Sequence, residues 1–271
     1  HKYEEAIEAY DKALSLKPDY YEAYNNKGVS LKDLGKISEA IKNYKKAIAL
    51  FPKNADTYTN IGVAYQEQGD FNSALEAFKK SISLKPKNTQ AYNNIGNIYQ
   101  DEGNLNKAIE AYNKAISIQP EYVDPYYNKG ICLHGQDKLD ESVEAYDKAL
   151  SLKPDYFDAY NNKGNALKDQ GKLEKAIKNY KKAITLKPDY AEAYVNLSLV
   201  LLNSGKLKKG LDEYEWRWKT KKDLARNFDL REKKEVIDTL AYKNQNTYPQ
   251  TFLFDYEKGE SKNKVIYPLG G

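Results

Sequence analysis

The 271-residue chain contains one cysteine, two histidines, three arginines and no methionine. Because Cys132 stands alone, the chain has neither an internal disulfide nor a cysteine-based metal site. His1 and His134 leave little for metal ligation or for histidine-based catalysis. No apolar run approaches the roughly eighteen residues that a membrane-spanning helix needs, so no membrane association is expected.

Charge of one sign is also lacking. The chain has 43 basic and 39 acidic residues, a net charge of +4, which is too small to indicate nucleic-acid binding. No signal peptide is visible. The chain starts at His1 without a methionine, as a fragment of a longer protein would. The compartment is left open, with the cytoplasm favoured.

Motifs that carry chemistry are missing as well. There is no Ser/His/Asp set, no phosphate-binding glycine loop before a helix and no metal-ligand spacing. Cys132 falls where other parts of the chain have small, mostly apolar residues, so we interpret it as a packing residue. We therefore expect no catalytic residues, no metal and no cofactor, and we do not expect the chain as given to be an enzyme.

What the chain does contain is a 34-residue period. Four rows of residues keep this spacing in register. The prolines are Pro18, Pro52, Pro86, Pro120, Pro154 and Pro188. One aromatic row is Tyr24, Tyr58, Tyr92, Tyr126, Tyr160 and Tyr194, and the other is Tyr10, Tyr44, Phe78, Tyr112, Tyr146, Tyr180 and Tyr214. The glycines are Gly28, Gly62, Gly96, Gly130 and Gly164.

Physical chemistry gives these rows a structural meaning. In the unit 21–54, apolar residues recur at helical spacing in two runs, which predicts two helices. Gly35 is placed to adopt the left-handed conformation that ends the first helix, and Pro52 stops the second. Gly28 and Ala40 are small where two antiparallel helices must approach closely. One pair cannot bury its apolar face alone, so neighbouring pairs are expected to stack into a continuous core.

The pattern resembles the tetratricopeptide repeat. The residues that match in the unit 21–54 are Tyr24, Gly28, Leu31, Gly35, Ala40, Tyr44, Ala47 and Pro52. The resemblance implies an all-α, right-handed superhelical solenoid of antiparallel helix pairs over residues 1–224. A half unit 1–20, without its first helix, precedes six units at 21–54, 55–88, 89–122, 123–156, 157–190 and 191–224.

The last unit is a degenerate cap, and a non-repeat segment 225–271 follows it. In the cap, Ser198 replaces the repeated glycine and Gly210 replaces the small alanine. The non-repeat segment is predicted to be a small α/β element. It has one helix at 232–244 and two strands, 251–256 and 264–267, around a Lys-Gly-Glu-Ser turn.

The resemblance also implies that the first helix of each pair lines a concave groove. The sixth residue of every full unit is asparagine: Asn26, Asn60, Asn94, Asn128, Asn162 and Asn196. Further groove amides at the fifth and ninth places are Asn25, Asn93, Asn161, Asn97 and Asn165, and His134 also falls at a groove position. An amide can pair with both the N–H and the C=O of an extended peptide.

This row is similar to the asparagine row in the repeats of O-linked N-acetylglucosamine transferases, which implies that it holds a substrate backbone. An alternative interpretation is that these asparagines pack between helices or cap a neighbouring carbonyl. Both interpretations stay open on the sequence.

The predicted groove is acidic in patches. Its carboxylates are Glu22, Asp33, Asp56, Glu67, Asp101, Asp124, Asp158 and Asp169. They favour a neutral or basic peptide, unless they only solvate an exposed wall. In the last unit the groove turns apolar at Val195, Leu199 and Leu202, and we expect the segment after 224 to cover that patch.

Three functions fit this sequence. The first is a protein–protein interaction scaffold or adaptor that binds a partner polypeptide in the groove. The second is the substrate-binding arm of a larger glycosyltransferase-like enzyme, because the sequence GLDEYEWRW at residues 210–218 resembles the end of arrays that precede such domains. The third is a scaffold that self-associates end to end.

Overall fold

The computed structural model describes residues 2–206, 208–210, 212, 253–255 and 260–262. The chain divides into two compact units, His1–Arg217 and Trp218–Gly271, and each is described by itself. Within the described residues, no helix is both long and apolar enough to cross a membrane.

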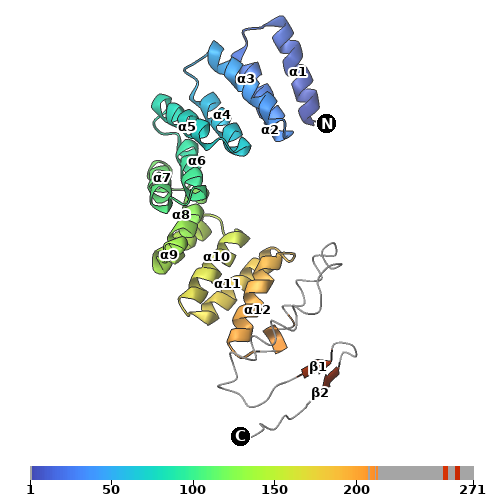
Figure 1. The fold of residues 1–271 in the computed structure, drawn as a ribbon, viewed down its shortest axis with the longest axis vertical. Coiled ribbons are helices and arrows are strands. Elements are labelled where there is room, and N and C mark those ends of the chain that lie inside the picture. The colour runs from blue at the N-terminus through green and yellow to red at the C-terminus, as the bar shows by residue number, and fades with distance from the viewer. Residues whose placement is uncertain (1, 207, 211, 213–252, 256–259, 263–271) are drawn as a thin grey trace, which may run out of the picture. The chain divides into compact units, whose positions relative to one another are not determined.

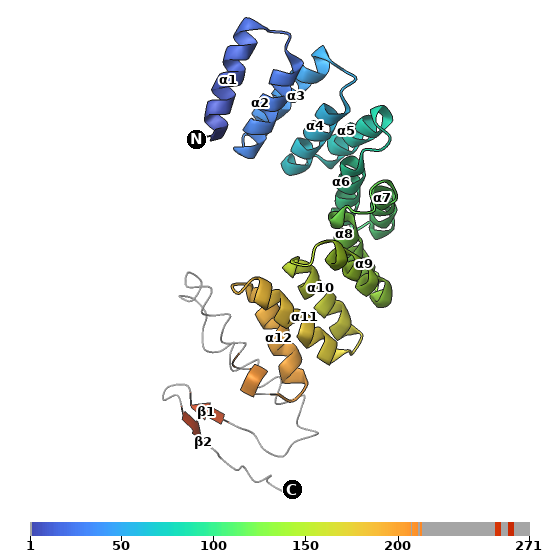
Figure 2. The ribbon, with the colours of Figure 1, turned by 180° about the vertical axis from the view of Figure 1, so that it is seen from behind.

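The first unit is a stack of helix pairs, which follow one another in chain order (Figures 1 and 2). The first helices of the pairs are α2 (Tyr21–Asp33), α4 (Ala55–Gln68), α6 (Thr89–Asp101), α8 (Val123–Gly135), α10 (Phe157–Asp169) and α12 (Ala191–Asn203). The second helices are α3 (Ile37–Leu50), α5 (Phe71–Leu84), α7 (Leu105–Ile118), α9 (Leu139–Leu152) and α11 (Leu173–Leu186), and α1 (Lys2–Leu16) precedes them all.

The turn inside each pair needs a left-handed residue. Gly35 has φ 75°, as predicted, and the equivalent residue of most other units is also a glycine with positive φ. The exception is Asp137, which holds φ 59°; aspartate is one of the few non-glycine residues that adopt this region.

Each pair is locked by one glycine against one aromatic ring. A Cβ added to Gly28 would lie 2.6 Å from Cε1 of Tyr44, which is far closer than two carbons can pack. The same approach joins Gly62 to Phe78, Gly96 to Tyr112, Gly130 to Tyr146 and Gly164 to Tyr180. All five rings are at most 1% exposed. The close approach expected at Gly28 is therefore confirmed, and the structure adds that the aromatic ring of the same pair fills the space above the glycine.

Neighbouring pairs also pack on one another. Consecutive first helices contact each other all along the stack, whereas consecutive second helices do not within the described residues. The first helices therefore form the inner wall of a curved stack and the second helices the outer wall. The handedness of the predicted superhelix stays a prediction.

The last described unit differs from the others, as expected for a terminal repeat. Ser198 is fully buried, and its hydroxyl donates to the Val195 carbonyl at 2.7 Å. A Cβ on Gly210 would lie 2.7 Å from Cγ of Leu202, so this glycine admits Leu202 to the interior. Leu202 is consequently buried rather than part of an open apolar groove, while Leu199 is 39% exposed. The residues expected to cover it lie outside the described part of the chain.

In the second unit, β1 (Leu253–Asp255) pairs with β2 (Glu260–Lys262) in an antiparallel register that sets Phe254 opposite Ser261. The second strand thus begins at a residue that we had predicted to be in the turn. The predicted helix 232–244 and strand 264–267 lie outside the described residues.

Candidate functional site

Amides join consecutive first helices on the inner wall. The sixth residue of a unit donates to the fifth, and in one case also to the ninth, residue of the preceding unit. These bonds run from Asn60 to Asn25 (3.0 Å), from Asn128 to Asn93 (3.4 Å) and Asn97 (3.0 Å), from Asn162 to the Tyr127 hydroxyl (3.0 Å), and from Asn196 to Asn161 (3.0 Å). We call this set the amide ladder. Its members have a structural role, whatever else they bind.

Two of the predicted groove amides lie inside the wall. Asn93 is 4% exposed and Asn161 is 0% exposed. Asn161 also donates to Glu192 Oε1 at 2.8 Å, so both its donor and its acceptor serve the repeat interface. We leave these two residues out of the contact surface considered below.

The ninth-place amides hold the core tyrosines. Tyr112 donates its hydroxyl to Asn97 and Tyr180 donates to Asn165, at 2.9 and 2.8 Å. Burial raises the pKa of both tyrosines above its ordinary value. The side chains of Asn97 and Asn165 therefore satisfy buried hydroxyls that would otherwise be costly.

Two other units have no ninth-place amide to accept a bond from the ring that packs beneath it. The ninth residue of the unit 55–88 is Val63, and the ring it faces is Phe78, which has no hydroxyl. In the unit 21–54 the ninth residue is Val29, and the buried Tyr44 hydroxyl has no hydrogen-bond partner among the described residues. Tyr44 thus carries a polar group for which its unit supplies no acceptor.

Two sixth-place amides stand outside the ladder as donors. Asn26 is exposed and accepts a bond from Asn25 at 3.2 Å. Asn94 is half-buried, and its side chain makes no hydrogen bond within the described part of the chain. The residues at the fifth and ninth places before it are Thr59, whose hydroxyl is used elsewhere, and Val63, which has no polar group.

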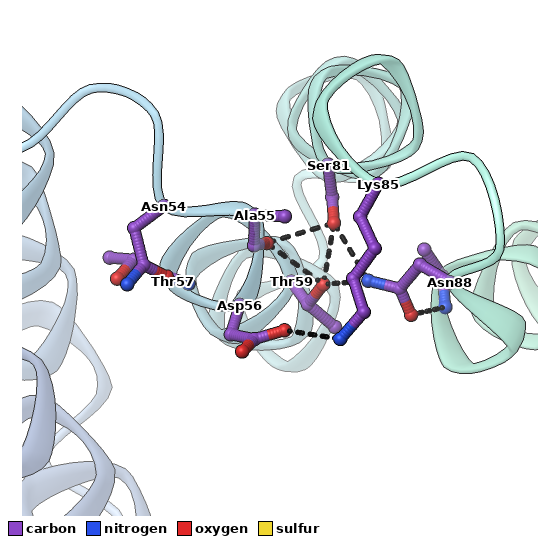
Figure 3. A network of polar contacts seen from close by, with 9 residues as sticks. Asn54, Ala55, Asp56, Thr57, Thr59, Ser81, Lys85 and Asn88 are labelled. Atoms are coloured by element: carbon purple, nitrogen blue, oxygen red, sulfur yellow. Dashed lines mark hydrogen bonds and ion pairs between the residues drawn. The ribbon is translucent and has the colours of Figure 1, made fainter.

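The Thr59 hydroxyl belongs to a buried network that the sequence analysis did not foresee (Figure 3). Thr59 Oγ1 lies 2.8 Å from Ser81 Oγ, and Asn88 Nδ2 donates to both hydroxyl oxygens at 2.8 Å. Both hydroxyls also donate to the Ala55 carbonyl, at 3.2 and 2.8 Å. Asn88 Oδ1 in turn accepts from the Ala91 N–H, which caps the start of α6.

Charged pairs lie along the edge of the inner wall where the first helices have their C-termini. Asp33 pairs with Lys32 at 2.7 Å, and Lys32 also reaches Glu67 at 3.7 Å. His134 Nε2 lies 2.8 Å from Asp169 Oδ2. His134, predicted as a groove residue with a single hydrogen bond, therefore uses that bond within the array.

The predicted groove carboxylates are exposed, except Asp158, which is half-buried. Negative charge on the wall raises the pKa of a neighbouring tyrosine. Burial, followed by the charges of Asp158 and Glu192, raises the pKa of Tyr127 to about 12. Carboxylates of α10 and α12 therefore lie close enough to act on a tyrosine of α8.

Cys132 is fully buried and donates to Gln100 Oε1 at 3.3 Å. Burial raises the pKa of its thiol to about 11, so little reactive thiolate is present at neutral pH. No group of His, Cys, Asp and Glu that could hold a metal ion occurs among the described residues.

Comparisons with known proteins agree with this architecture. The family model described as TPR repeat matches residues 2–35, 30–69, 133–170 and 164–205. Two models of the tetratricopeptide repeat match 55–88 with 89–122, and 111–144. No curated protein matches the chain.

Several solved structures are similar. MamA protein is 30% identical, with a TM-score of 0.55 over 64% of this chain and 94% of that chain. YrrB, described as a TPR protein with an unusual peptide-binding site, is 23% identical, with a TM-score of 0.56 over 74% of this chain and all of its own. PilF of Pseudomonas aeruginosa is 17% identical, with a TM-score of 0.66 over 87% of this chain and all of its own.

Proposed function

Since the chain belongs to the tetratricopeptide repeat family, we propose that it is a protein-interaction scaffold whose inner wall binds an extended segment of another polypeptide. The observation that carries the proposal is the spare hydrogen-bonding capacity of the wall. An asparagine amide offers two N–H donors and an acceptor oxygen. Donors of the ladder such as Asn60 and Asn196 commit one bond each, so a free donor and acceptor remain on half-buried side chains.

The contact set comprises the sixth-place amides with the ninth-place ones beside them: Asn26, Asn60, Asn94, Asn128, Asn162, Asn196, Asn97 and Asn165. A segment lying across this wall would exchange backbone hydrogen bonds with the amides. Because the helices are already packed, little ordering of the wall accompanies binding. The exposed carboxylates favour a neutral or basic segment over an acidic one.

The two alternatives have less support. For the enzyme arm, the sequence that motivated it, residues 210–218, lies mostly outside the described residues. The matching family models describe the tetratricopeptide repeat in general, and the similarity to O-linked N-acetylglucosamine transferase repeats stays a prediction. End-to-end self-association stays a prediction.

Selection from a displayed library of random dodecapeptides tests the proposal. We expect the parent chain to enrich peptides, and N-methylation of alternate peptide bonds in an enriched sequence should weaken binding about tenfold or more, as loss of one or two backbone hydrogen bonds would. The Asn26→Ala/Asn94→Ala variant should bind less tightly. Its control, Lys178→Ala/Lys181→Ala on the exterior of α11, should bind like the parent.

The proposal fails if no peptide is enriched above the bare support. It also fails if the lysine variant loses binding while the asparagine variant keeps it, because the outer wall would then be the binding surface.

A further inference from the structure

Five junctions join consecutive first helices between α2 and α12, and four of them carry hydrogen bonds or ion pairs between side chains of the two helices. Asn60–Asn25 and Lys32–Glu67 join α2 to α4, and Asn128–Asn93 and Cys132–Gln100 join α6 to α8. Asn162–Tyr127 and His134–Asp169 join α8 to α10, and Asn196–Asn161 joins α10 to α12. Among the described residues, no such bond joins α4 to α6.

The sequence explains this gap. Opposite Asn94, the preceding unit offers Val63 and a threonine, Thr59, whose hydroxyl is turned into the buried network with Ser81 and Asn88. The polar contacts of this junction therefore lie behind the wall (Figure 3). The Asn94 amide on the wall is left with its full hydrogen-bonding capacity.

A carboxylate at the same junction, that of Asp101, also lacks a partner among the described residues. Asp101 is the last residue of α6, is exposed, and is the only charged residue of that helix. An anion at a helix C-terminus is unfavourable, because the helix dipole is negative there. The other carboxylates at this level have a lysine of the chain itself: Asp33 and Glu67 share Lys32, and Asp169 has Lys168. Asp101 has no ion pair within the described residues.

We propose that the α4–α6 junction is the anchor of the groove, where Asn94 pairs with a peptide unit of the bound segment and Asp101 pairs with a lysine or arginine of the same segment. This inference rests on the proposed function and selects, from the row of similar amides, the one that the array itself does not use. The ligand supplies the cation that α6 lacks.

Helix geometry gives the spacing. Asn94 and Asp101 are seven residues apart, which is two turns, so they share one face of α6 at a separation of about 10 Å. An extended chain covers that distance in about three residues. A segment that turns along α6 after the peptide unit bound by Asn94 should therefore carry its basic residue about three positions further on.

Selection with the same dodecapeptide library, followed by fluorescence anisotropy of enriched peptides, tests the anchor. With the parent chain we expect a lysine or arginine to be enriched at one place, and its replacement by glutamine in the peptide should weaken binding about tenfold. The Asp101→Asn variant should lose this preference, and Asp101→Lys should reverse it in favour of glutamate. Asn94→Ala should weaken binding to lysine and glutamine peptides alike.

The matched control is Asp33→Asn, which removes an equivalent carboxylate that already has an internal cation, and it should leave the preference unchanged. Neither Asn94→Ala nor Asp101→Asn breaks an internal bond, so both should melt at the temperature of the parent. If peptides are enriched but the preference ignores Asp101, or follows Asp33, the anchor is wrong while the proposed function stands. If no peptide is enriched, the proposed function itself fails.

Discussion

The α10–α12 and α4–α6 junctions are built from the same repeat, yet they place their polar bonds on different sides of the wall. At α10–α12, Asn196 donates to the buried Asn161, which donates to Glu192, so amides of the inner wall join the helices. At α4–α6, the bonds run through Thr59, Ser81 and Asn88 in the interior, and Asn94 has none. A residue that recurs every 34 positions therefore does not have one role, because its partner one unit away decides whether it supports the fold or is free to bind.

The largest effect is expected at α10–α12. Asn161→Ala removes a buried acceptor and a donor, and takes from Asn196 and from Glu192 Oε1 the bonds they make with it, so it should cost about 2–3 kcal/mol of unfolding free energy. Asn94→Ala should cost less than about 0.5 kcal/mol, because no internal bond is lost. Urea denaturation followed by circular dichroism measures both, and equal losses would contradict the comparison.

The interior network of α4–α6 should come next. Asn88→Ala removes the cap of α6 and the bonds to two buried hydroxyls, for an expected loss of about 2 kcal/mol. The control is Asn104→Ala, an exposed asparagine cap of α7 whose one bond, to the Lys107 N–H, is 3.3 Å long. It should cost about 0.5–1 kcal/mol. If the two substitutions cost the same in urea denaturation, the network contributes nothing beyond the cap.

A smaller difference in unfolding free energy is expected between substitutions of two core tyrosines, Tyr180 and Tyr44. Tyr180→Phe leaves Asn165 without its bond and should cost about 1 kcal/mol. Tyr44→Phe removes a hydroxyl that has no partner, so it should be neutral or stabilising by up to about 1 kcal/mol. Melting temperatures of the two variants should move in opposite directions or, at the least, differ. A loss from Tyr44→Phe as large as that from Tyr180→Phe would show that the Tyr44 hydroxyl is satisfied.

The smallest effect concerns the turn inside the helix pair, which is independent of the junction type. Asp137→Gly replaces the one non-glycine residue with positive φ in the described array. Relief of left-handed strain, partly offset by the greater entropy of glycine in the unfolded chain, should stabilise by about 0.5 kcal/mol. A small rise in the urea midpoint checks this, and a fall would mean that the aspartate side chain stabilises the turn.

Much of the fold followed from the sequence, since it depends on residues that act within one unit. The close approach at Gly28 lies inside a single helix pair, and Gly35 acts within a single turn, so a 34-residue period is enough to predict both. The helix pairs between residues 21 and 190 follow from the same spacing. The degenerate residues Ser198 and Gly210 correctly marked the last unit as different.

The division of the amide row into bonded and free members did not follow, because it depends on which atoms meet across two units. Thr59, Ser81 and Asn88 are each ordinary residues in their own rows, and only their meeting in space makes a network. A signal did exist: the unit 55–88 departs from both of its neighbours at the fifth residue, Thr59, and at a core alanine, where it has Ser81. Two such replacements in one unit indicate a local network, even where each one alone indicates nothing.

The contacts between first helices also have a mechanical consequence. A load that straightens the curved stack must pull the first helices apart, and contacts between second helices are absent from the described array, so the inner wall carries that load. The resistance of the stack to stretching then depends on the contacts at each junction between consecutive first helices. At α4–α6 the side-chain bonds lie in the interior and none lies on the inner wall, so a segment bound across that junction would add a link on the wall and stiffen it.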